Sequence, residues 1–262
     1  MSKNDAHRGE TEIVVFGRHP VEEAIRSEGV EVLHLAIAKG RSSSDRKAFR
    51  RLAHENDLLL DEISRSEMDR LTDAPRHDQG MAAVVRLRRV IELDAYLASL
   101  SGPAARHPAR VIGLDGVTNS QNVGMVVRSI VGAGIDGLLW PLVGQPWING
   151  LVVRAASGAI FECPILRCSS IEAGIAALQG AGFTAFGLAA DGESSLFASP
   201  PPHRSVYILG GESAGLSSNV RGQLDRLVHI PMEGRLESLN VAVAAGLVAF
   251  HAAGLLSPKF EG

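Results

Sequence analysis

Three stretches in the second half of the chain place polar, chemically competent side chains beside long apolar runs. The first holds Asn122 and Arg128, the second holds Glu212 directly after two glycines, and the third holds Ser238 and Asn240. Carboxylate, guanidinium and amide groups can position a hydroxyl, grip a phosphate and stabilise a developing negative charge. Arg128 lies among apolar helical neighbours, so we expect it to bind an anion or to emerge at a pocket.

Each stretch also has a purely structural explanation. Asn119, Ser120 or Asn122 could cap the helix that follows, and Ser238 could cap the last one. Glu212 could belong to a tight turn. Taken one at a time, the three stretches therefore do not establish a site.

The elements around these stretches predict how they would be brought together. Strand-like runs cover 110–115, 137–140, 159–166, 183–190, 205–211 and 227–232, and helix-like segments separate them. This alternation predicts a parallel sheet covered by helices on both faces. Ligands of such sheets bind at the carboxyl ends of the strands, where the three polar stretches stand.

The first ninety residues predict a smaller unit. Strand-like runs at 12–17, 31–38, 58–63 and 81–87 alternate with helix-like ones. We expect an α/β protein with a small substrate-binding domain at 1–90, a linker at 91–108 that is rich in Gly, Pro and Ala, and a catalytic domain at 109–262. Residues 39–51 carry six basic side chains against Asp45 alone, which suggests either a solvated helix face or a phosphate-contacting patch.

Composition and other motifs exclude several classes. The net charge is −3, so we expect local rather than general contact with nucleic acid. Cys163 and Cys168 lack zinc spacing, and we expect neither a disulfide nor a metal site. The G-x-G-x-x-G at 132–137 closes a helix instead of opening one, so it predicts a helix end and not a dinucleotide site. Nothing at the N-terminus marks export and the apolar run at 241–256 is short for a membrane span, so we expect a cytoplasmic protein.

Together the stretches resemble the SpoU family of RNA ribose 2′-O-methyltransferases, of the SPOUT class. The matching segments are Asn119–Gly124 with Arg128, Gly210–Leu216 with Ile230–Met232, and Ser238–Val241; "RAASGA" at 154–159 is similar to a further family segment. Ser120 and Ser213 depart from the family pattern, which affects loop shape and not the reacting groups. "VVFGRHPVEEAI" (14–25) and "HDQGMAAVV" (77–85) look like the two ends of the ribosomal-protein-like (L30e-like) RNA-binding domain that precedes the catalytic domain in many members.

The resemblance implies a deep trefoil knot, S-adenosylmethionine as methyl donor, a homodimer whose two subunits complete the site, and no metal. By motif match, the cofactor would be lined by Leu188, Gly210, Ile230, Met232, Ser238 and Leu239. The catalytic set would be Asn122, Arg128, Glu212, Ser238 and Asn240. A guanidinium is a poor base, so we expect Arg128 to hold a phosphate and stabilise the alkoxide, Glu212 to orient Arg128 or a bridging water, and the others to hold ribose or loop. The RNA-binding set would be Lys39, Arg41, Arg46, Lys47, Arg50 and Arg51.

The additional N-terminal domain favours ribosomal RNA, with a guanosine of 23S rRNA as the expected target. Transfer RNA methylation and resistance-conferring rRNA methylation remain alternatives within the family. A non-catalytic RNA-binding or ribosome-assembly protein would be expected to lose Arg128 or Glu212, and both are present. A dehydrogenase is disfavoured by the misplaced glycine pattern.

Overall fold

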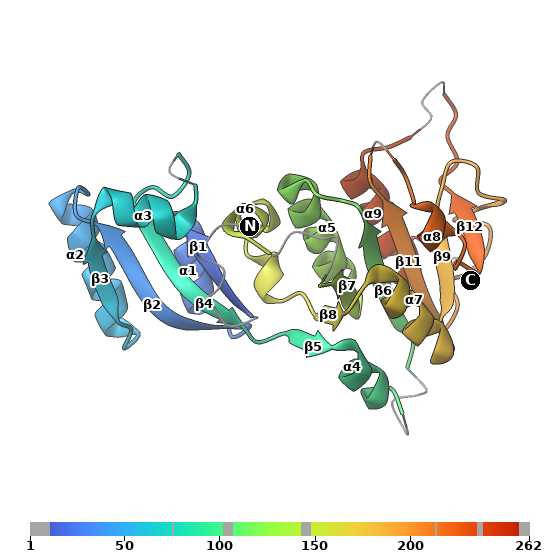
Figure 1. The fold of residues 1–262 in the computed structure, drawn as a ribbon, viewed down its shortest axis with the longest axis horizontal. Helices are drawn as coiled ribbons and strands as arrows, with labels where there is room; N and C mark the ends of the chain where they lie inside the picture. The colour runs from blue at the N-terminus through green and yellow to red at the C-terminus, as the bar shows by residue number, and fades with distance from the viewer. Residues whose placement is uncertain are drawn as a thin grey trace, which may run out of the picture. The chain divides into compact units, whose positions relative to one another are not determined.

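A computed structural model describes residues 11–74, 76–101, 107–142, 148–212, 214–234 and 238–256. The chain divides into two compact units (Figure 1). Unit 1 comprises Met1–Arg89 and Ile148–Glu162, and unit 2 comprises Val90–Trp147 and Cys163–Gly262. A short segment from the middle of the chain thus belongs to unit 1.

Unit 1 is built on a four-stranded sheet of order β1-β4-β2-β3, in which only β2 and β3 run parallel. Its elements are β1 (Glu12–Phe16), α1 (Arg18–Arg26), β2 (Val30–Ala38), α2 (Ser43–Glu55), β3 (Leu60–Ile63), α3 (Arg65–Thr72), β4 (Met81–Leu87), α6 (Gly150–Ala156) and η3 (Ala159–Phe161).

Alternating side chains give this sheet two buried faces. On one face, Phe16, Ala36 and Ala82 pack with Met68 of α3. Residues between them in sequence, such as Val15, Leu35 and Ala83, are buried as well. Both sides of the strands are therefore covered, as the period of two requires.

Unit 2 is built on an eight-stranded sheet of order β10-β12-β9-β11-β6-β7-β8-β5, with every pair parallel. Its elements are β5 (Val90–Glu92), α4 (Leu93–Ser99), β6 (Ala109–Asp115), α5 (Ser120–Ala133), β7 (Gly137–Pro141), β8 (Ile165–Cys168), α7 (Ile171–Gly180), β9 (Thr184–Leu188), β10 (Ser194–Ser195), β11 (Arg204–Gly210), α8 (Ser218–Arg221), β12 (Arg226–His229) and α9 (Val241–Ala252).

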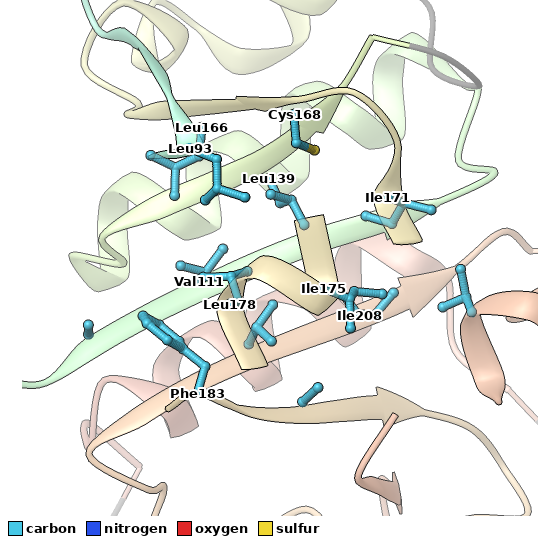
Figure 2. Close-up of a cluster of buried hydrophobic side chains, with 14 residues drawn as sticks. Leu93, Val111, Leu139, Leu166, Cys168, Ile171, Ile175, Leu178, Phe183 and Ile208 are labelled. Atoms are coloured by element: carbon cyan, nitrogen blue, oxygen red, sulfur yellow. The ribbon is translucent and has the colours of Figure 1, made fainter. Parts of the chain in front are cut away.

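Helices cover both faces of the parallel sheet. Figure 2 shows one of the two cores, where Ile175 and Leu178 of α7 meet Val111 of β6 and Ile208 of β11. Helix α9 contacts β11 and packs along α5, which contacts β7. The predicted α/β class and its helix-covered parallel sheet are confirmed.

The order of the strands in space departs from their order in sequence at one edge. Strand β12 lies between β9 and β10, both of which precede it in the chain, and it pairs in parallel with each. The chain then continues into α9, which packs against α5 and β11. The last described part of the chain is therefore inserted among elements formed from earlier segments.

Three local predictions need correction. The run 159–166 is not one strand, because η3 follows a left-handed Gly158 and the strand β8 begins only at Ile165. Strand β5 and helix α4 lie in the expected linker, and β5 pairs with β8. Helix α9 begins at Val241 with Asn240 as its N-cap, so Ser238 is not the cap. The helix end predicted from the glycine pattern is confirmed, because Gly134 caps α5 with a φ of 68°.

Candidate active site

A pocket of about 540 Å³ lies at the carboxyl ends of β9, β11 and β12. Three chain segments line it, the ones that follow β9, β11 and β12. The structure places all six residues expected at a cofactor at this pocket: Leu188, Gly210, Ile230, Met232, Ser238 and Leu239. A volume in this range is typical of sites that enclose a ligand of cofactor size.

Glycines make one wall of the pocket from main chain alone. A Cβ atom on Gly210 would lie 2.1 Å from the carbonyl carbon of Gly215, and one on Gly211 would lie 2.8 Å from the carbonyl oxygen of Gly116. The amide of Gly215 donates to the carbonyl of Gly211 over 2.8 Å, which closes the loop after β11. Side chains at these positions would force the loops apart, so the wall depends on glycine.

One hydrogen-bonded cluster joins the three polar stretches. The amide nitrogen Nδ2 of Asn122 donates to Oε1 of Glu212 at 2.9 Å, and Nδ2 of Asn240 donates to the same oxygen at 2.5 Å. Nδ2 of Asn240 also lies 3.2 Å from Oδ1 of Asn122. Asn122 precedes Glu212 by 90 residues and Asn240 by 118, so distant segments meet at one carboxylate.

The cluster is held rigidly by its own helices. Asn122 is only 6% exposed in the first turn of α5, whose N-cap is Asn119. Oδ1 of Asn240 accepts a hydrogen bond from the amide of Ala242 at 2.9 Å, so the same side chain caps α9 and binds Glu212. Asn240 is therefore both the N-cap of α9 and a residue of the candidate site.

Asp115 is a further positioning residue that sequence reasoning missed. Its Oδ2 accepts from the amide of Ser217 at 2.6 Å, and its carbonyl accepts from the amide of Gly211 at 2.9 Å. It thereby ties the end of β6 to the loop that carries Glu212. A carboxylate at the end of a buried strand and before a glycine was the available signal.

Sequence reasoning also missed an ion pair that lines the same pocket, between Asp191 and Arg221. The carboxylate of Asp191 makes a two-pronged contact with Arg221, with distances of 3.0 Å to Nη1 and 2.7 Å to Nη2. The hydrogen bond from Arg221 holds the pKa of Asp191 below its ordinary value. Both residues line the pocket and connect the loop after β9 to α8.

The structure does not bring Arg128 to this cluster within one chain. Arg128 is exposed on α5 and is not among the lining residues of the pocket. It follows Asn122 by six residues, which rotates it by about 240° around the helix. The expected contact with Glu212 is absent from the described residues, because that carboxylate instead accepts hydrogen bonds from Asn122 and Asn240.

The predicted RNA-binding residues are less positive than the sequence window suggests. Nearby carboxylates bind four of them: Asp45 pairs with Arg41, Glu62 with Arg46 and Arg50, and Glu55 with Arg51. Glu62 comes from β3, outside the basic window, so the count against Asp45 alone was incomplete. Lys39 lies in the turn after β2 and Lys47 lies on α2, both beside these pairs.

The described residues form neither a metal centre nor a membrane-spanning helix. Among the described residues, no group of three or more His, Cys, Asp or Glu side chains is arranged to hold a metal ion. In the same part of the chain, no helix has the length and apolar character needed to cross a membrane. Cys163 and Cys168 are free and buried, and burial raises the pKa of each thiol to about 12. Ser213 lies outside the described residues.

Comparisons of the sequence with known families match both parts of the chain. Residues 109–250 match the model of the SpoU rRNA Methylase family. Residues 14–90 match a model described as RNA 2′-O ribose methyltransferase substrate binding. A tRNA/rRNA methyltransferase of Mycobacterium sp. (strain KMS) is 33% identical over 91% of this chain and 75% of its own length. A TrmH family tRNA/rRNA methyltransferase of Staphylococcus saprophyticus is 29% identical over 91% and 94%.

Solved structures with the same fold include two that hold S-adenosylmethionine. The SpoU methyltransferase AviRb from Streptomyces viridochromogenes, in complex with that cofactor, aligns with a TM-score of 0.72 at 24% identity, over 97% of this chain and 93% of its own. An S-adenosylmethionine-bound rRNA methyltransferase from Sinorhizobium meliloti aligns with a TM-score of 0.69 at 22% identity, over 94% and 88%. These likenesses show the fold, that of the SPOUT class with an N-terminal substrate-binding domain. The family match over more than half of the chain shows that it belongs to the SpoU rRNA methylase family.

Proposed function

We propose that this protein transfers a methyl group from S-adenosylmethionine to a ribose 2′-hydroxyl of ribosomal RNA, at a guanosine of 23S rRNA. The observation that carries the proposal is the cluster of Asn122, Glu212 and Asn240 at the edge of a pocket walled by main chain. The family match for a 2′-O ribose methyltransferase substrate-binding domain at 14–90 supports RNA and its ribose as the substrate. With a ribosomal RNA substrate, we expect a cytoplasmic protein.

The residues present fit the proposed cofactor. A Cβ on Gly210 or Gly211 would collide with the main chain of Gly215 or Gly116, so glycine lets these loops close together beside the pocket. Leu188, Ile230 and Leu239 supply apolar surface beside them. When bound, S-adenosylmethionine supplies an electrophilic methyl group on a sulfonium sulfur, which needs no metal for its transfer. This division between main-chain polar groups and aliphatic walls suits a nucleoside that carries a charged tail.

The chain's own polar groups then position the nucleophile. Glu212 accepts from two amides and fixes the loop after β11 relative to the starts of α5 and α9. We assign Asn122 and Asn240 to holding this edge of the pocket and Ser238 to the adjoining wall. Preorganised groups of this kind lower the barrier because they need not reorganise during reaction.

Arg128 acts, in this proposal, in the site of a partner subunit. It projects from α5 beside α9, and α9 leaves Val243 54% exposed and Phe250 36% exposed although it is already buried on its other side. A helix that is apolar on all sides is suited to a second packing surface. A homodimer through α5 and α9 would bury these side chains and carry Arg128 of the partner subunit towards a substrate phosphate.

Labelled methyl transfer tests the proposal. The full chain is incubated with methyl-labelled S-adenosylmethionine and either whole ribosomal RNA or tRNA, and the modified position is mapped by alkaline hydrolysis, which a 2′-O-methyl group blocks. We expect label on a ribose of 23S rRNA. Label on a base would overturn the reaction, and label confined to tRNA would overturn the substrate.

A further inference from the structure

A cavity rich in arginine lies in unit 1 beyond the start of the basic helix α2, and its lining includes Arg41 of the predicted RNA-binding set. It measures about 380 Å³ and is lined by Ala38, Gly40, Arg41, Arg65, Arg76, Asp78, Gln79 and Gly80. We call it the arginine pocket. Its lining holds three arginines and one carboxylate; outside the lining, Asp45 pairs with Arg41 and Asp69 with Arg65.

Sheet topology brings the lining together at one end of the sheet. Strand β2 ends at Ala38, and its antiparallel neighbour β4 begins at Met81 at the same end. The amide of Ala38 donates to the carbonyl of Gly80 at 2.9 Å, and the amide of Lys39 donates to the carbonyl of Ile63 at 2.9 Å. Helix α3, which begins with Arg65, therefore starts beside the turns that carry Arg41 and Arg76.

Asp78 holds one of the three arginines in place. It is fully buried, and its carboxylate receives Nη1 of Arg65 at 2.7 Å and Nη2 at 2.6 Å. It also accepts from the amide of Gly80 at 2.7 Å and the hydroxyl of Thr72 at 3.1 Å. Burial alone would raise the pKa of Asp78, but hydrogen bonds from Arg65, Gly80 and Thr72 hold that pKa below its ordinary value. The carboxylate is thus ionised and fully engaged.

The other two arginines present donors to the pocket. Nε of Arg41 is buried and has no hydrogen-bond partner in the described part of the chain, although its Nη2 binds Asp45. Arg76 is exposed, and among residues placed in the structure no carboxylate pairs with it. A guanidinium is the side chain best suited to bind phosphate oxygens in two-pronged fashion.

Two glycines keep the pocket open. A Cβ on Gly80 would lie 2.8 Å from Cδ of Arg41, and Gly80 has a left-handed φ of 67°, so Arg41 can lie across the start of β4. A Cβ on Gly40 would meet no atom within 4 Å. Gly80 therefore makes room for the side chain of Arg41, and Gly40 leaves open space around its own Cα.

We propose that the arginine pocket binds a backbone phosphate of the RNA substrate and is the main electrostatic contact of unit 1. On α2, by contrast, Glu55 and Glu62 offset Arg46, Arg50 and Arg51. The inference rests on the proposed RNA substrate but not on the methyl-transfer step. Phosphate contacts position an RNA without reading its sequence, which suits a domain whose task is to hold substrate.

A charge-only pair of variants tests the proposal. Gly40 lacks a positive φ and has open space, so both Gly40→Glu and Gly40→Gln should fold as the wild type does. End-labelled ribosomal RNA is titrated with the full-length variants at several salt concentrations, without S-adenosylmethionine. We expect Gly40→Glu to weaken binding about tenfold, the effect of about one charge-assisted hydrogen bond, and Gly40→Gln to bind far closer to the wild type. Equal affinity of the two variants would overturn the proposal.

Loss of single arginines adds a readout that a structural effect would not produce. Arg76→Gln should reduce the slope of log affinity against log salt by about one, and Arg41→Gln, whose guanidinium already pairs with Asp45, by less. Arg86→Gln is the matched control for Arg41→Gln. The Arg86 side chain is 44% exposed and ion-paired, with Glu12 and Glu31, as that of Arg41 is 37% exposed and paired with Asp45. Arg86 lies on β4, nearer the opposite end of the sheet. An unchanged slope in both pocket variants, or an equal fall in the control, would refute the assignment.

Calorimetric titration of S-adenosylmethionine separates this inference from the proposed function. All these variants should bind the cofactor as the wild type does, because its pocket lies in unit 2. Methyl transfer to RNA with no effect of the arginine variants on RNA affinity would leave the proposed function standing and remove the inference. RNA binding that depends on the arginines, without any methyl transfer, would do the reverse.

Discussion

The two units of the chain build pockets at the ends of their sheets from opposite materials. In unit 2, Gly210 and Gly211 line the pocket without side chains, and two amides beside them bind the carboxylate of Glu212. In unit 1, guanidinium groups fill the same topological position, and a buried Asp78 orders one of them. A compact nucleoside ligand is enclosed by shape and directional hydrogen bonds, whereas a polyanion is held by charge. The difference indicates a division between chemistry and substrate capture within one chain.

The most severe test replaces the main-chain wall. Gly210→Val puts a side chain where even a Cβ would lie 2.1 Å from Gly215. We expect at least about a hundredfold loss of S-adenosylmethionine affinity, since overpacking costs about 1–3 kcal/mol and the ligand loses its main-chain partners as well. Calorimetry measures the loss. RNA affinity should remain within about twofold of the wild type, and a parallel fall in it would break the division.

The next variant keeps the shape of the site and changes its charge. Glu212→Gln keeps one oxygen that can accept both amide hydrogen bonds but removes the negative charge. Turnover should fall about 10- to 100-fold, the range for hydrogen bonds to a charged group, while cofactor affinity changes little. Single-turnover methyl transfer at saturating cofactor provides the measurement. Glu193→Gln is the control, and near-normal turnover of Glu212→Gln would remove this residue from the reaction.

Acid sensitivity sharpens the account of unit 1. The pKa of Asp78 is depressed in the folded state, so the stability it contributes is present above its unfolded value, about 3.9, and is lost as the pH falls through the folded value. Asp78→Asn should lower the free energy of unfolding at pH 7 by about 1–3 kcal/mol, the range for one charged hydrogen-bond partner, and less at pH 3. Urea unfolding at both pH values measures the difference. An equal loss at both would show that burial, and not charge, is the important property of Asp78.

The smallest expected effect concerns the basic helix. Arg51→Gln removes a charge that Glu55 already offsets on an exposed surface, so RNA affinity should change by less than about twofold. Titration under the conditions used for Arg76→Gln allows direct comparison. A larger effect for Arg51→Gln than for Arg76→Gln would move the RNA path onto α2, where the sequence alone had placed it.

Much of the fold could be predicted from sequence because aliphatic strands and helices alternate regularly. The run 159–166 misled because it is mostly apolar, with Glu162 as its one charged residue, and the left-handed turn at Gly158 just before it was not recognised. Helix α4 was not predicted, although Leu93, Tyr96, Leu97 and Leu100 repeat at helical spacing. The Gly and Pro residues that follow are typical of a linker, and the whole segment was therefore predicted as one.

The sequence predicted which residues belong to the candidate site but not the contacts among them. Family resemblance singled out Asn122, Glu212 and Asn240 separately, while the hydrogen bonds among them depend on packing between segments far apart in sequence. The same limit explains the basic helix, whose partner Glu62 arrives from another strand. Glu212 was expected to orient Arg128 or a bridging water; within one chain it binds Asn122 and Asn240, and Arg128 lies six residues further along α5.

The insertion of β12 between β9 and β10 has a consequence for how the protein is made. Parallel pairing of distant segments is slow, because the entropy of loop closure is lost before any contact rewards it. The chain from β12 through Asn240 must find its place after its neighbours exist, and it supplies Ile230, Leu239 and Asn240 to the pocket. During synthesis, unit 1 can therefore fold and become able to bind RNA before the chain from β12 through Asn240 completes the pocket of unit 2. Substrate capture would precede catalytic competence in the life of each molecule.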